Sequence, residues 1–284
     1  MRLFQSAGSL PLGVDFRNGS LSIVALEERA HGVDIREAGT VAIPAFDETI
    51  VDLRVAQAVR ELLATFSTHE RRCVLAAPAG EVVCRPFHLS PGTRRAEAYR
   101  AAALEADVLA PWPAAERSVS LDPLPNLDGA MLLSVARREP LENRLAMMRA
   151  AGLKPVAVDI PGCVWRRAVA CADAVLDCGG ERAALTIFAE PLGPTQLFAP
   201  RLVADRLAGQ VRAAFVEARR TGLADVQRVA IAGDADRAEA IGELLVADGY
   251  SLAPVRIGET ESPSWLFAYG LASWASASRG LIGA

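Results

Sequence analysis

Two short stretches of this chain share one pattern, in which an apolar strand, an aspartate, a turn of small residues and a second apolar strand follow one another. The first stretch spans residues 12–26 and carries Asn18-Gly19 near its centre. Because Asn and Gly tolerate positive φ, they predict a tight hairpin turn, with Asp15 at the end of the first strand and Ser20 after the turn. Taken alone, such a stretch is more often an ordinary N-terminal hairpin with a solvated aspartate than a binding site.

The second stretch repeats the pattern at residues 174–188, where Asp177 precedes Cys178-Gly179-Gly180. Two aspartate-bearing hairpins, one opening each half of the chain, predict a duplicated fold. In such a fold the two turns face each other across a cleft between the halves. The pair of hairpins is therefore the strongest constraint that the sequence places on the fold.

The order of elements after the first hairpin indicates which duplicated fold this is. Residues 32–43 alternate between apolar and polar side chains and predict a third strand; residues 50–66 have helical spacing, and residues 73–78 predict a buried strand. This β-β-β-α-β order matches a ribonuclease-H-like core, whereas a Rossmann unit begins β-α-β with a glycine-rich first turn. Neither G-x-G-x-x-G nor G-x-x-x-x-G-K-[ST] occurs in the sequence.

A second set of elements interrupts the first core. Residues 81–153 predict the order β-α-β-β-α, which we interpret as an inserted subdomain. Its first helix is expected to begin with Ser90 as the cap and Pro91 as the first helical residue. After residues 154–161 return to a strand, the second half repeats β-β-β-α-β-α and ends in a helix near residues 263–275.

The composition excludes several classes of function. A net charge of −4 gives no basic field that would attract nucleic acid or anionic lipid. The five cysteines form no C-x-x-C pair and the three histidines cluster with nothing, so we expect free thiols in a reducing compartment and no metal site. No segment reaches the roughly 18 apolar residues of a membrane span, and the first residues lack a signal-peptide core. We therefore expect a cytoplasmic protein.

Several segments resemble the PilM family of type IV pilus assembly proteins, a branch of the actin-like ATPase superfamily. Residues 13–26 align without a gap with the family's opening pattern, close to G-I-D-I-G-S-S-S-V-K-L-V-E-L. Residues 131–139 are similar to its "LLVAARRE" run, residues 147–156 to "LLEAAGLEPVVVD", and residues 267–272 to its closing "PAVGLAL". The order and spacing of these segments carry the resemblance over nearly the whole chain.

The resemblance implies an α/β, actin-like (ribonuclease-H-like) duplicated fold with an inserted α+β subdomain and a truncated second half. The expected division is residues 1–80 with 154–172 as the first core, residues 81–153 as the inserted subdomain and residues 173–284 as the second core. Asp15 and Ser20 match the carboxylate and hydroxyl of the family's first phosphate loop, and Asp177 and Gly179 match the second. If a nucleotide site is retained, its residues are Asp15, Asn18, Gly19, Ser20, Asp177, Gly179, Gly180 and Gly233. No catalytic residue and no metal ligand is assigned.

Departures from the family pattern argue against a working ATP site. Arg17 and Ser22 stand where the family has Gly and Lys, and Glu181-Arg182 stands where hydroxyl residues are expected. The adenine-side glycine cluster is reduced to Gly233 beside two acids. Between the third and fourth strands of the second half there is room for one helix, without the subdomain that walls the nucleotide cleft. A second half shortened in this way is similar to HofM, an abbreviated relative. We expect no cofactor, and binding of Mg-ATP is the alternative.

Two functions follow from the resemblance. The first is a cytoplasmic scaffold, peripheral to the inner membrane, of a pilus, competence or type II-like secretion machine. Its partner would be the N-terminal cytoplasmic tail of a PilN-like bitopic membrane protein, held between the first core and the inserted subdomain. Further partners would be a pilus or secretion ATPase, or a second copy of this chain. The alternative is an actin-like ATPase or nucleotide-dependent switch.

A third function, a sugar kinase of the same superfamily, would need an aspartate base. Asp159 is the only candidate, and capping of the helix that follows it is the more ordinary interpretation. The sequence does not locate the groove for the partner's tail or say which machine is served.

Overall fold

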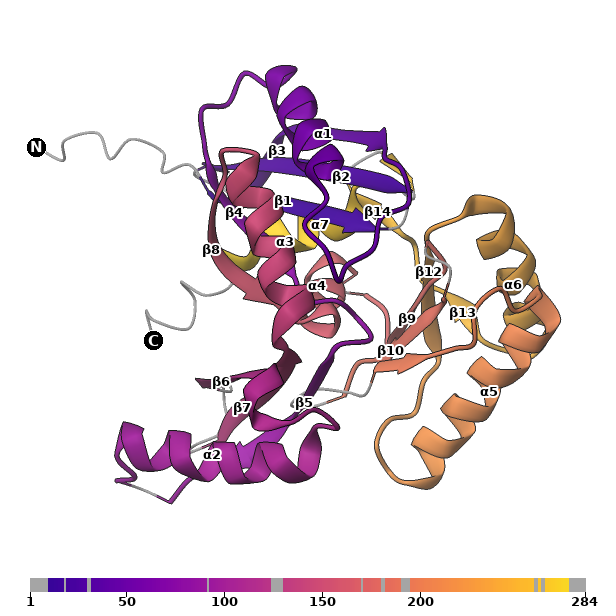
Figure 1. Ribbon diagram of the computed structural model, residues 1–284. Coiled ribbons are helices and arrows are strands. Elements are labelled where there is room, and N and C mark those ends of the chain that lie inside the picture. The colour runs from indigo at the N-terminus through magenta and orange to yellow at the C-terminus, as the bar shows by residue number, and fades with distance from the viewer. Residues whose placement is uncertain are drawn as a thin grey trace, which may run out of the picture.

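Two five-stranded sheets, each covered by helices, form the body of the molecule, and a smaller three-stranded unit projects from the first of them (Figure 1). This arrangement comes from a computed structural model. The model describes residues 10–17, 19–29, 32–90, 92–123, 130–169, 171–179, 182–189, 195–257, 260–261 and 264–275.

The first sheet has the strand order β3-β2-β1-β4-β8. Its first three strands are antiparallel neighbours, and β4 and β8 run parallel to β1. The predicted third and fourth strands are thus confirmed at the two sides of the first hairpin. The strands are β1 (Leu12–Arg17), β2 (Ser20–Arg29), β3 (Gly32–Ala42), β4 (Arg72–Ala76) and β8 (Lys154–Asp159).

The second sheet repeats this topology in the order β11-β10-β9-β12-β13. Here too the first three strands are antiparallel neighbours, and the fourth and fifth are parallel to the first. The duplicated fold expected from the two hairpins is therefore confirmed, and the shared topology agrees with the actin-like fold that the resemblance implies. The strands are β9 (Ala174–Asp177), β10 (Ala184–Ile187), β11 (Thr195–Leu197), β12 (Arg228–Ala232) and β13 (Ser251–Leu252).

The helices form layers outside and between the two sheets. Helices α1 and α3 pack on the outer face of the first sheet, and α5 and α6 pack on the outer face of the second. Helices α4 and α7 lie between the sheets, in a core that draws apolar side chains from both halves. The bounds are α1 (Leu53–Ala64), α3 (Arg138–Ala150), α4 (Pro161–Ala168), α5 (Ala204–Arg220), α6 (Ala235–Ala247) and α7 (Leu266–Ala272).

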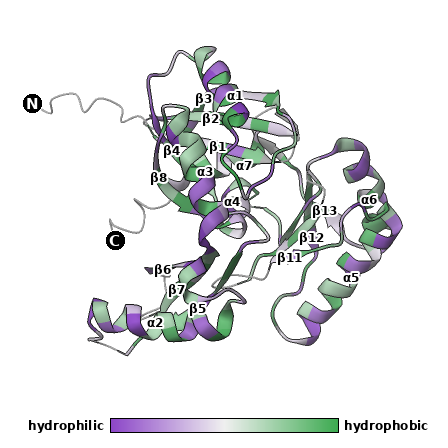
Figure 2. Cartoon of the chain, viewed as in Figure 1, coloured by the Kyte–Doolittle hydropathy of each residue, from purple (hydrophilic) through white to green (hydrophobic). Residues whose placement is uncertain are grey.

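Strand alternation decides which side chains of the first hairpin reach the space between the halves. Val14 and Phe16 of β1 point into the outer core beneath α1 and α3. Gly13 and Asp15 therefore face the opposite side, toward α7, because successive side chains of a strand point to opposite faces. Figure 2 shows that the strands are largely hydrophobic, whereas hydrophilic and hydrophobic segments alternate along α1 and α5.

The inserted subdomain is an antiparallel sheet of order β5-β7-β6 covered by helix α2. Its strands are β5 (Val82–His88), β6 (Arg117–Pro123) and β7 (Ala130–Arg137), and α2 spans Arg95–Leu109. A short 3₁₀ turn, η1 (Ala114–Glu116), precedes β6. The predicted order of elements is thus present, with the long turn before β7 outside the described residues.

The predicted start of α2 at Ser90 is wrong. The helix begins at Arg95, with Arg94 as its cap residue and Glu97 accepting a hydrogen bond from the Arg94 N–H. Gly92 has a φ of +80°, which the helix cannot accommodate, and the Thr93 N–H and hydroxyl both bond to the Ser90 carbonyl. Ser90 therefore opens a turn, and the helix starts after it.

Two helices, α3 and α7, pack on the first sheet although the expected division places them in other units. The C-terminal half of α3 contributes Met147 and Met148 to the outer core of the first sheet. Helix α7, from the end of the chain, packs on β1 and β2 of that same sheet through Ala268 and Ala272. The division at residues 80, 153 and 172 stays a proposal, and this packing would assign α7 to the first half.

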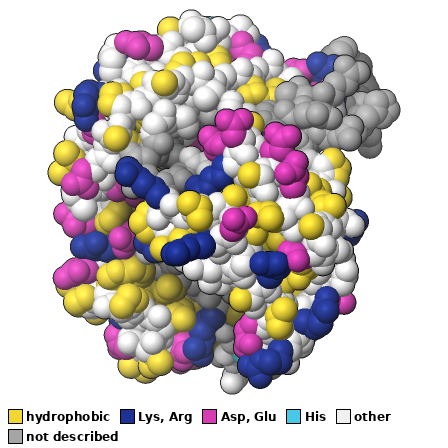
Figure 3. All heavy atoms as spheres, turned by 90° about the vertical axis from the view of Figure 1, so that its right-hand side faces the viewer, with side chains coloured by type: hydrophobic (Ala, Val, Ile, Leu, Met, Phe, Trp, Pro, Cys, Tyr) yellow, Lys and Arg dark blue, Asp and Glu magenta, His cyan; other side chains and the backbone are white. Residues whose placement is uncertain are grey.

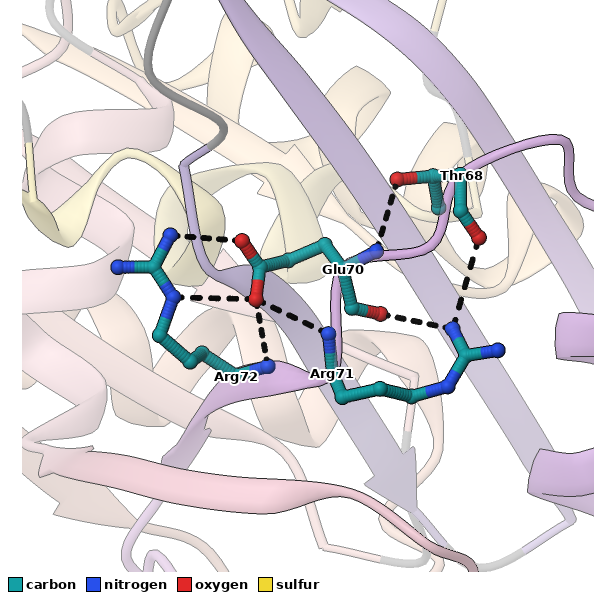
Figure 4. A network of polar contacts seen from close by, with 4 residues as sticks. All are labelled: Thr68, Glu70, Arg71 and Arg72. Carbon is teal, nitrogen blue, oxygen red and sulfur yellow. Dashed lines mark hydrogen bonds and ion pairs between the residues drawn. The ribbon is translucent and has the colours of Figure 1, made fainter.

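The entry into β4 is fixed by a compact polar network (Figure 4). The Glu70 carboxylate accepts hydrogen bonds from the backbone N–H groups of Arg71 and Arg72 and from the Arg72 guanidinium. The Arg72 pKa is raised by this carboxylate. Arg71 in turn accepts a backbone hydrogen bond from Lys154 at 2.7 Å. The network thereby sets where β4 and β8 begin together.

Two short strands, β14 (Arg256–Ile257) and β15 (Thr260–Glu261), form a ribbon before α7. Within the described part of the chain, no helix is long and apolar enough to cross a membrane.

Candidate functional site

The two aspartate-bearing hairpins do meet at one cavity, of about 220 Å³, between the halves of the molecule. Asp15 and Ser20 reach it from the first hairpin, and Gly179 and Gly233 reach it from the second half. Four of the eight predicted residues are thus brought together. The other lining residues are Trp165, Ala232, Asp234, Val255, Ser264, Leu266 and Phe267.

The other four predicted residues do not line the cavity or lie outside the described residues. Gly19 has a φ of +97° and lies at the exposed tip of the first hairpin, as its predicted turn requires, but it does not line the cavity. Asp177 does not line it either, although it contacts Gly179, which does. Asn18 and Gly180 lie outside the described residues.

Asp15 is held deep in the first sheet and is only 7% exposed. It pairs in register with Ser22 of β2, so that the carboxylate and the hydroxyl share the face of the sheet that looks toward α7. Ser22 bonds to the Thr40 hydroxyl of β3 at 2.8 Å. Ser22 and Thr40 do not line the cavity themselves, and they form a hydroxyl pair on the sheet face that carries Asp15.

A hydroxyl from the far end of the chain joins this pair. The Ser264 hydroxyl donates to Thr40 Oγ1 at 2.9 Å, across 224 positions of sequence. The Ser22 hydroxyl also donates to the Ser264 carbonyl at 3.4 Å. Sequence reasoning missed Ser264, because no local pattern marks a serine that meets its partners only after folding.

At the end of β9, the backbone N–H groups that follow Asp177 already have hydrogen-bond acceptors. The Gly179 N–H donates to Asp177 Oδ1 at 2.9 Å, and the Cys178 N–H donates to the Ala232 carbonyl at 2.7 Å. Gly233 has a φ of +110°, and a Cβ atom there would lie 2.2 Å from the Gly179 nitrogen. Glycine is thus required at 233 for its backbone angle and for the close approach of two loops.

Aromatic side chains form the base of the cavity. The rings of Trp165, from α4, and Phe267, from α7, pack edge to face with their centroids 5.0 Å apart. Both side chains are almost fully buried in the core between the halves. The sequence analysis assigned neither residue to the site.

Two further acidic groups, Asp234 of the cavity lining and Asp159 at the end of β8, have structural partners. Asp234 caps α6 by accepting a hydrogen bond from the Arg237 N–H at 2.9 Å. Asp159 forms an ion pair with Arg167 and accepts a hydrogen bond from the Ile160 N–H at 2.7 Å. Ile160, not Asp159, is the cap residue of α4, so the capping role expected for Asp159 is wrong, and a buried ion pair takes its place.

A second hollow, of about 570 Å³, lies beside the N-terminal end of α3. Its lining is charged and polar, from η1 and from the end of β7 and the start of α3: Ala115, Glu116, Arg137, Arg138, Glu139, Glu142 and Asn143. Asn143 also donates to the Glu48 carbonyl, in the segment before α1, at 3.1 Å. One lining residue of the hollow therefore also contacts the segment before α1.

A family model described as type IV pilus assembly protein PilM matches residues 13–190. The chain belongs to this PilM family. The match covers the first core, the inserted subdomain and the second aspartate-bearing hairpin. The site described above is therefore the position at which a PilM-family fold brings its two hairpins together.

Solved structures show the same fold over nearly the whole chain. A chain of a PilM-PilN type IV pilus biogenesis complex is 20% identical, with a TM-score of 0.73 over 92% of this chain and 97% of that one. The cytoplasmic domain of EpsL, an inner membrane component of the type II secretion system of Vibrio cholerae, is 14% identical, with a TM-score of 0.53 over 94% of both chains. The ethanolamine utilization protein EutJ from Carboxydothermus hydrogenoformans is 15% identical, with a TM-score of 0.52 over 94% and 91%.

The surface of this PilM-family chain carries both signs of charge. On the face shown in Figure 3, Lys and Arg side chains alternate with Asp and Glu side chains. Among the described residues, no group of three or more His, Cys, Asp or Glu side chains is arranged to hold a metal ion. That the chain does not bind nucleic acid stays a prediction.

Proposed function

We propose that this PilM-family chain is a scaffold in the inner-membrane assembly complex of a type IV pilus, competence or type II-like secretion machine. Its partner is the N-terminal cytoplasmic tail of a PilN-like membrane protein, and the chain acts at the cytoplasmic side of the inner membrane. One observation supports this most directly: the fold matches a chain of a PilM-PilN complex over 92% of its length, inserted subdomain included.

The tail would bind beside the N-terminal end of α3, in the 570 Å³ hollow. The two arginines there are already engaged, since Arg137 pairs with Glu81 and Glu139, and Arg138 donates to the Arg117 carbonyl. Glu116 and Glu142 are exposed. Glu142 also pairs with Arg149, and Arg138 keeps its charge because a carbonyl is neutral. With three carboxylates and two guanidiniums, the lining has a net charge of −1, which suits an extended tail that carries a basic residue among apolar anchors.

Titration calorimetry with a synthetic peptide tests the scaffold role. The peptide is the cytoplasmic tail of the bitopic membrane protein encoded beside this chain. We expect saturable binding with a Kd of about 1 μM, which corresponds to about −8 kcal/mol. No binding, together with failure of the two full-length proteins to co-purify, would contradict the proposal.

A charge-reversal pair tests where the tail binds. The variant Glu116→Lys with Glu142→Lys should weaken binding by about 10-fold or more, because a basic tail would then meet two cations. The matched control is Glu239→Lys with Glu243→Lys, which makes the same charge change at two exposed positions on α6. Equal loss in both variants would show general electrostatic attraction and remove the hollow from the proposal.

A further inference from the structure

The actin-like fold implies a nucleoside triphosphate between its two halves, and the 220 Å³ cavity lies where such a ligand would sit. The residues present there do not fit that ligand. We infer that the cleft of this chain is closed to nucleoside triphosphates, and that the chain binds its partners without responding to nucleotide.

Volume is the first obstacle. Sites for small molecules and cofactors enclose about 300–1,000 Å³, which is more than this cavity offers. The cavity is bounded on one side by Trp165 and Phe267, which are 3% and 5% exposed. These rings belong to the core that joins the two sheets, so enlarging the cavity would require dismantling packing between the halves.

The donors that a phosphate needs are the second obstacle. Phosphate sites are built from backbone N–H groups and cationic side chains aimed at the ligand. Here the Gly179 N–H is bonded to Asp177, and the Cys178 N–H is bonded to the Ala232 carbonyl. Arg182, three residues after Gly179, donates its Nε–H to the Phe198 carbonyl at 3.0 Å.

The charge of the lining is the third obstacle. The described residues that line the cavity include two carboxylates, Asp15 and Asp234, and no Lys or Arg. A polyphosphate brought between these carboxylates without a metal ion would meet repulsion from like charge. The side-chain donors among the described lining residues are the hydroxyls of Ser20 and Ser264 and the indole N–H of Trp165, and Ser264 already donates to Thr40.

Direct contacts between loops are the fourth obstacle. Gly233 lies against the backbone of Gly179, at a distance that leaves no room for a Cβ atom. On the other wall, Ser264 joins the segment before α7 to β3 of the first sheet. The first contact holds two loops of the second half against each other, and the second holds the segment before α7 on the first sheet, so each wall of the cavity is fixed by contacts within its own half.

Nucleotide titration of the full chain tests the inference. We expect no saturable binding of Mg-ATP or Mg-ADP up to about 1 mM and no rise in the melting temperature, with a nucleotide-binding protein of the same fold as positive control. Circular dichroism of the sample confirms that the chain is folded. A saturable Kd in the micromolar range, lost in Asp15→Ala, would overturn the inference.

Hydrogen exchange gives a second readout that does not depend on a heat signal. Mg-ATP should leave the exchange of peptides covering residues 10–22, 174–179 and 228–236 unchanged. Protection of these three segments together would overturn the inference, because it would place the nucleotide in the cleft.

The tail peptide separates this inference from the proposed scaffold role. Allosteric coupling typically changes affinity by about 5- to 150-fold, so a Kd for the peptide that is equal with and without Mg-ATP supports independence from nucleotide. A Kd that shifts by about 5-fold or more would overturn it while leaving the scaffold role intact. If the peptide does not bind and the two full-length proteins do not co-purify, the scaffold role fails, and the titration and exchange experiments still decide the closure of the cleft.

Discussion

Gly13 of β1 lies so close to Ala268 of α7 that a Cβ atom at position 13 would sit 1.8 Å from the Ala268 carbonyl oxygen. The first residue of the family-like opening pattern is therefore a packing residue. It lets the C-terminal helix lie directly on the strand that carries Asp15.

Replacing Gly13 with alanine should strongly destabilise the chain. Overpacking of a well-packed core usually costs about 1–3 kcal/mol, and the atom met here is backbone, which cannot move aside as a side chain can. We expect the Gly13→Ala loss of unfolding free energy to be about 3 kcal/mol or more, measured by urea denaturation.

Gly209→Ala is the matched control for this substitution. Gly209 lies within α5, and the nearest atom to an added Cβ is the flexible end of Arg212, at 3.7 Å. Alanine is favoured over glycine in a helix by about 0.5–1 kcal/mol, so this variant should be slightly more stable than the parent. Similar losses in both variants would contradict the packing role of Gly13.

The five cysteines should differ sharply in their reactivity. Burial raises the pKa of Cys73, Cys163 and Cys178 to about 12 and that of Cys84 to about 11. Cys171 is exposed. At pH 8, a thiol with a pKa of about 12 is ionised in about one molecule in ten thousand, and the thiolate is the reactive form.

Iodoacetamide labelling of the native chain, followed by peptide mass spectrometry, checks this ranking. We expect Cys171 to be alkylated first and the other four to follow only on unfolding. The variant Cys171→Ser should lose the fast phase. Rapid native labelling of Cys73 or Cys178, both at most 2% exposed, would contradict their burial.

The cap of α1 should make part of the stability depend on pH. Asp52 accepts hydrogen bonds from the Arg54 guanidinium and from the Arg54 N–H, and these hold its pKa below the usual value. Because the folded pKa is lowered, the stabilisation is complete above the unfolded pKa of about 3.9. It is lost as the pH falls through the folded pKa.

Two substitutions divide the contribution of Asp52. Asp52→Ala removes cap and charge and should cost about 1 kcal/mol at pH 7. Asp52→Asn keeps a capping oxygen and should cost less, because Arg54 is 63% exposed and ion pairs to such exposed side chains contribute about 0.2–1 kcal/mol. Denaturation at pH 7, 5 and 3 should show the gap between parent and Asp52→Asn constant down to pH 5 and closing below about pH 4. A gap that widens on acidification would reverse the assigned sign.

Local patterns predicted the elements of this fold, and long-range contacts supplied what they missed. The hairpins, the alternation of β3 and the helical spacing of α1 depend on neighbours in sequence, and the structure shows them near their predicted positions. The meeting of Asp15, Ser20, Gly179 and Gly233 also followed, because duplication with a cleft implies it.

The parts that escaped prediction depend on distant residues or on one backbone angle. Ser264 meets Thr40 across 224 positions, and Trp165 meets Phe267 only because α4 and α7 are packed between two sheets. Helix α2 begins after Gly92 because that residue has a positive φ, which a Ser-Pro signal does not reveal. The departures at Arg17 and at Glu181-Arg182 argued against a working ATP site, but the size of the cavity depends on how α4 and α7 pack between the sheets.

Arg144 of α3 should be the side chain that joins the inserted subdomain to the first core. It is 9% exposed, donates to the Ala76 carbonyl at 2.9 Å, and pairs with Glu48. Its guanidinium lies over the Phe16 ring, 4.9 Å from the centroid. Removing one partner of a buried pair costs about 3–5 kcal/mol, and because Glu48 is partly exposed we expect about 2 kcal/mol for Arg144→Ala.

The variants Arg144→Met and Arg149→Ala show what that cost consists of. Methionine preserves much of the packing on Phe16 without the charge, so it should recover part of the loss if packing contributes. Arg149 is on the same helix with a side chain 60% exposed, and its removal should change stability by less than about 0.5 kcal/mol. Peptide binding is measured alongside urea denaturation, because α3 also lines the 570 Å³ hollow. If Arg144→Ala is as stable as Arg149→Ala, this side chain does not join the two units.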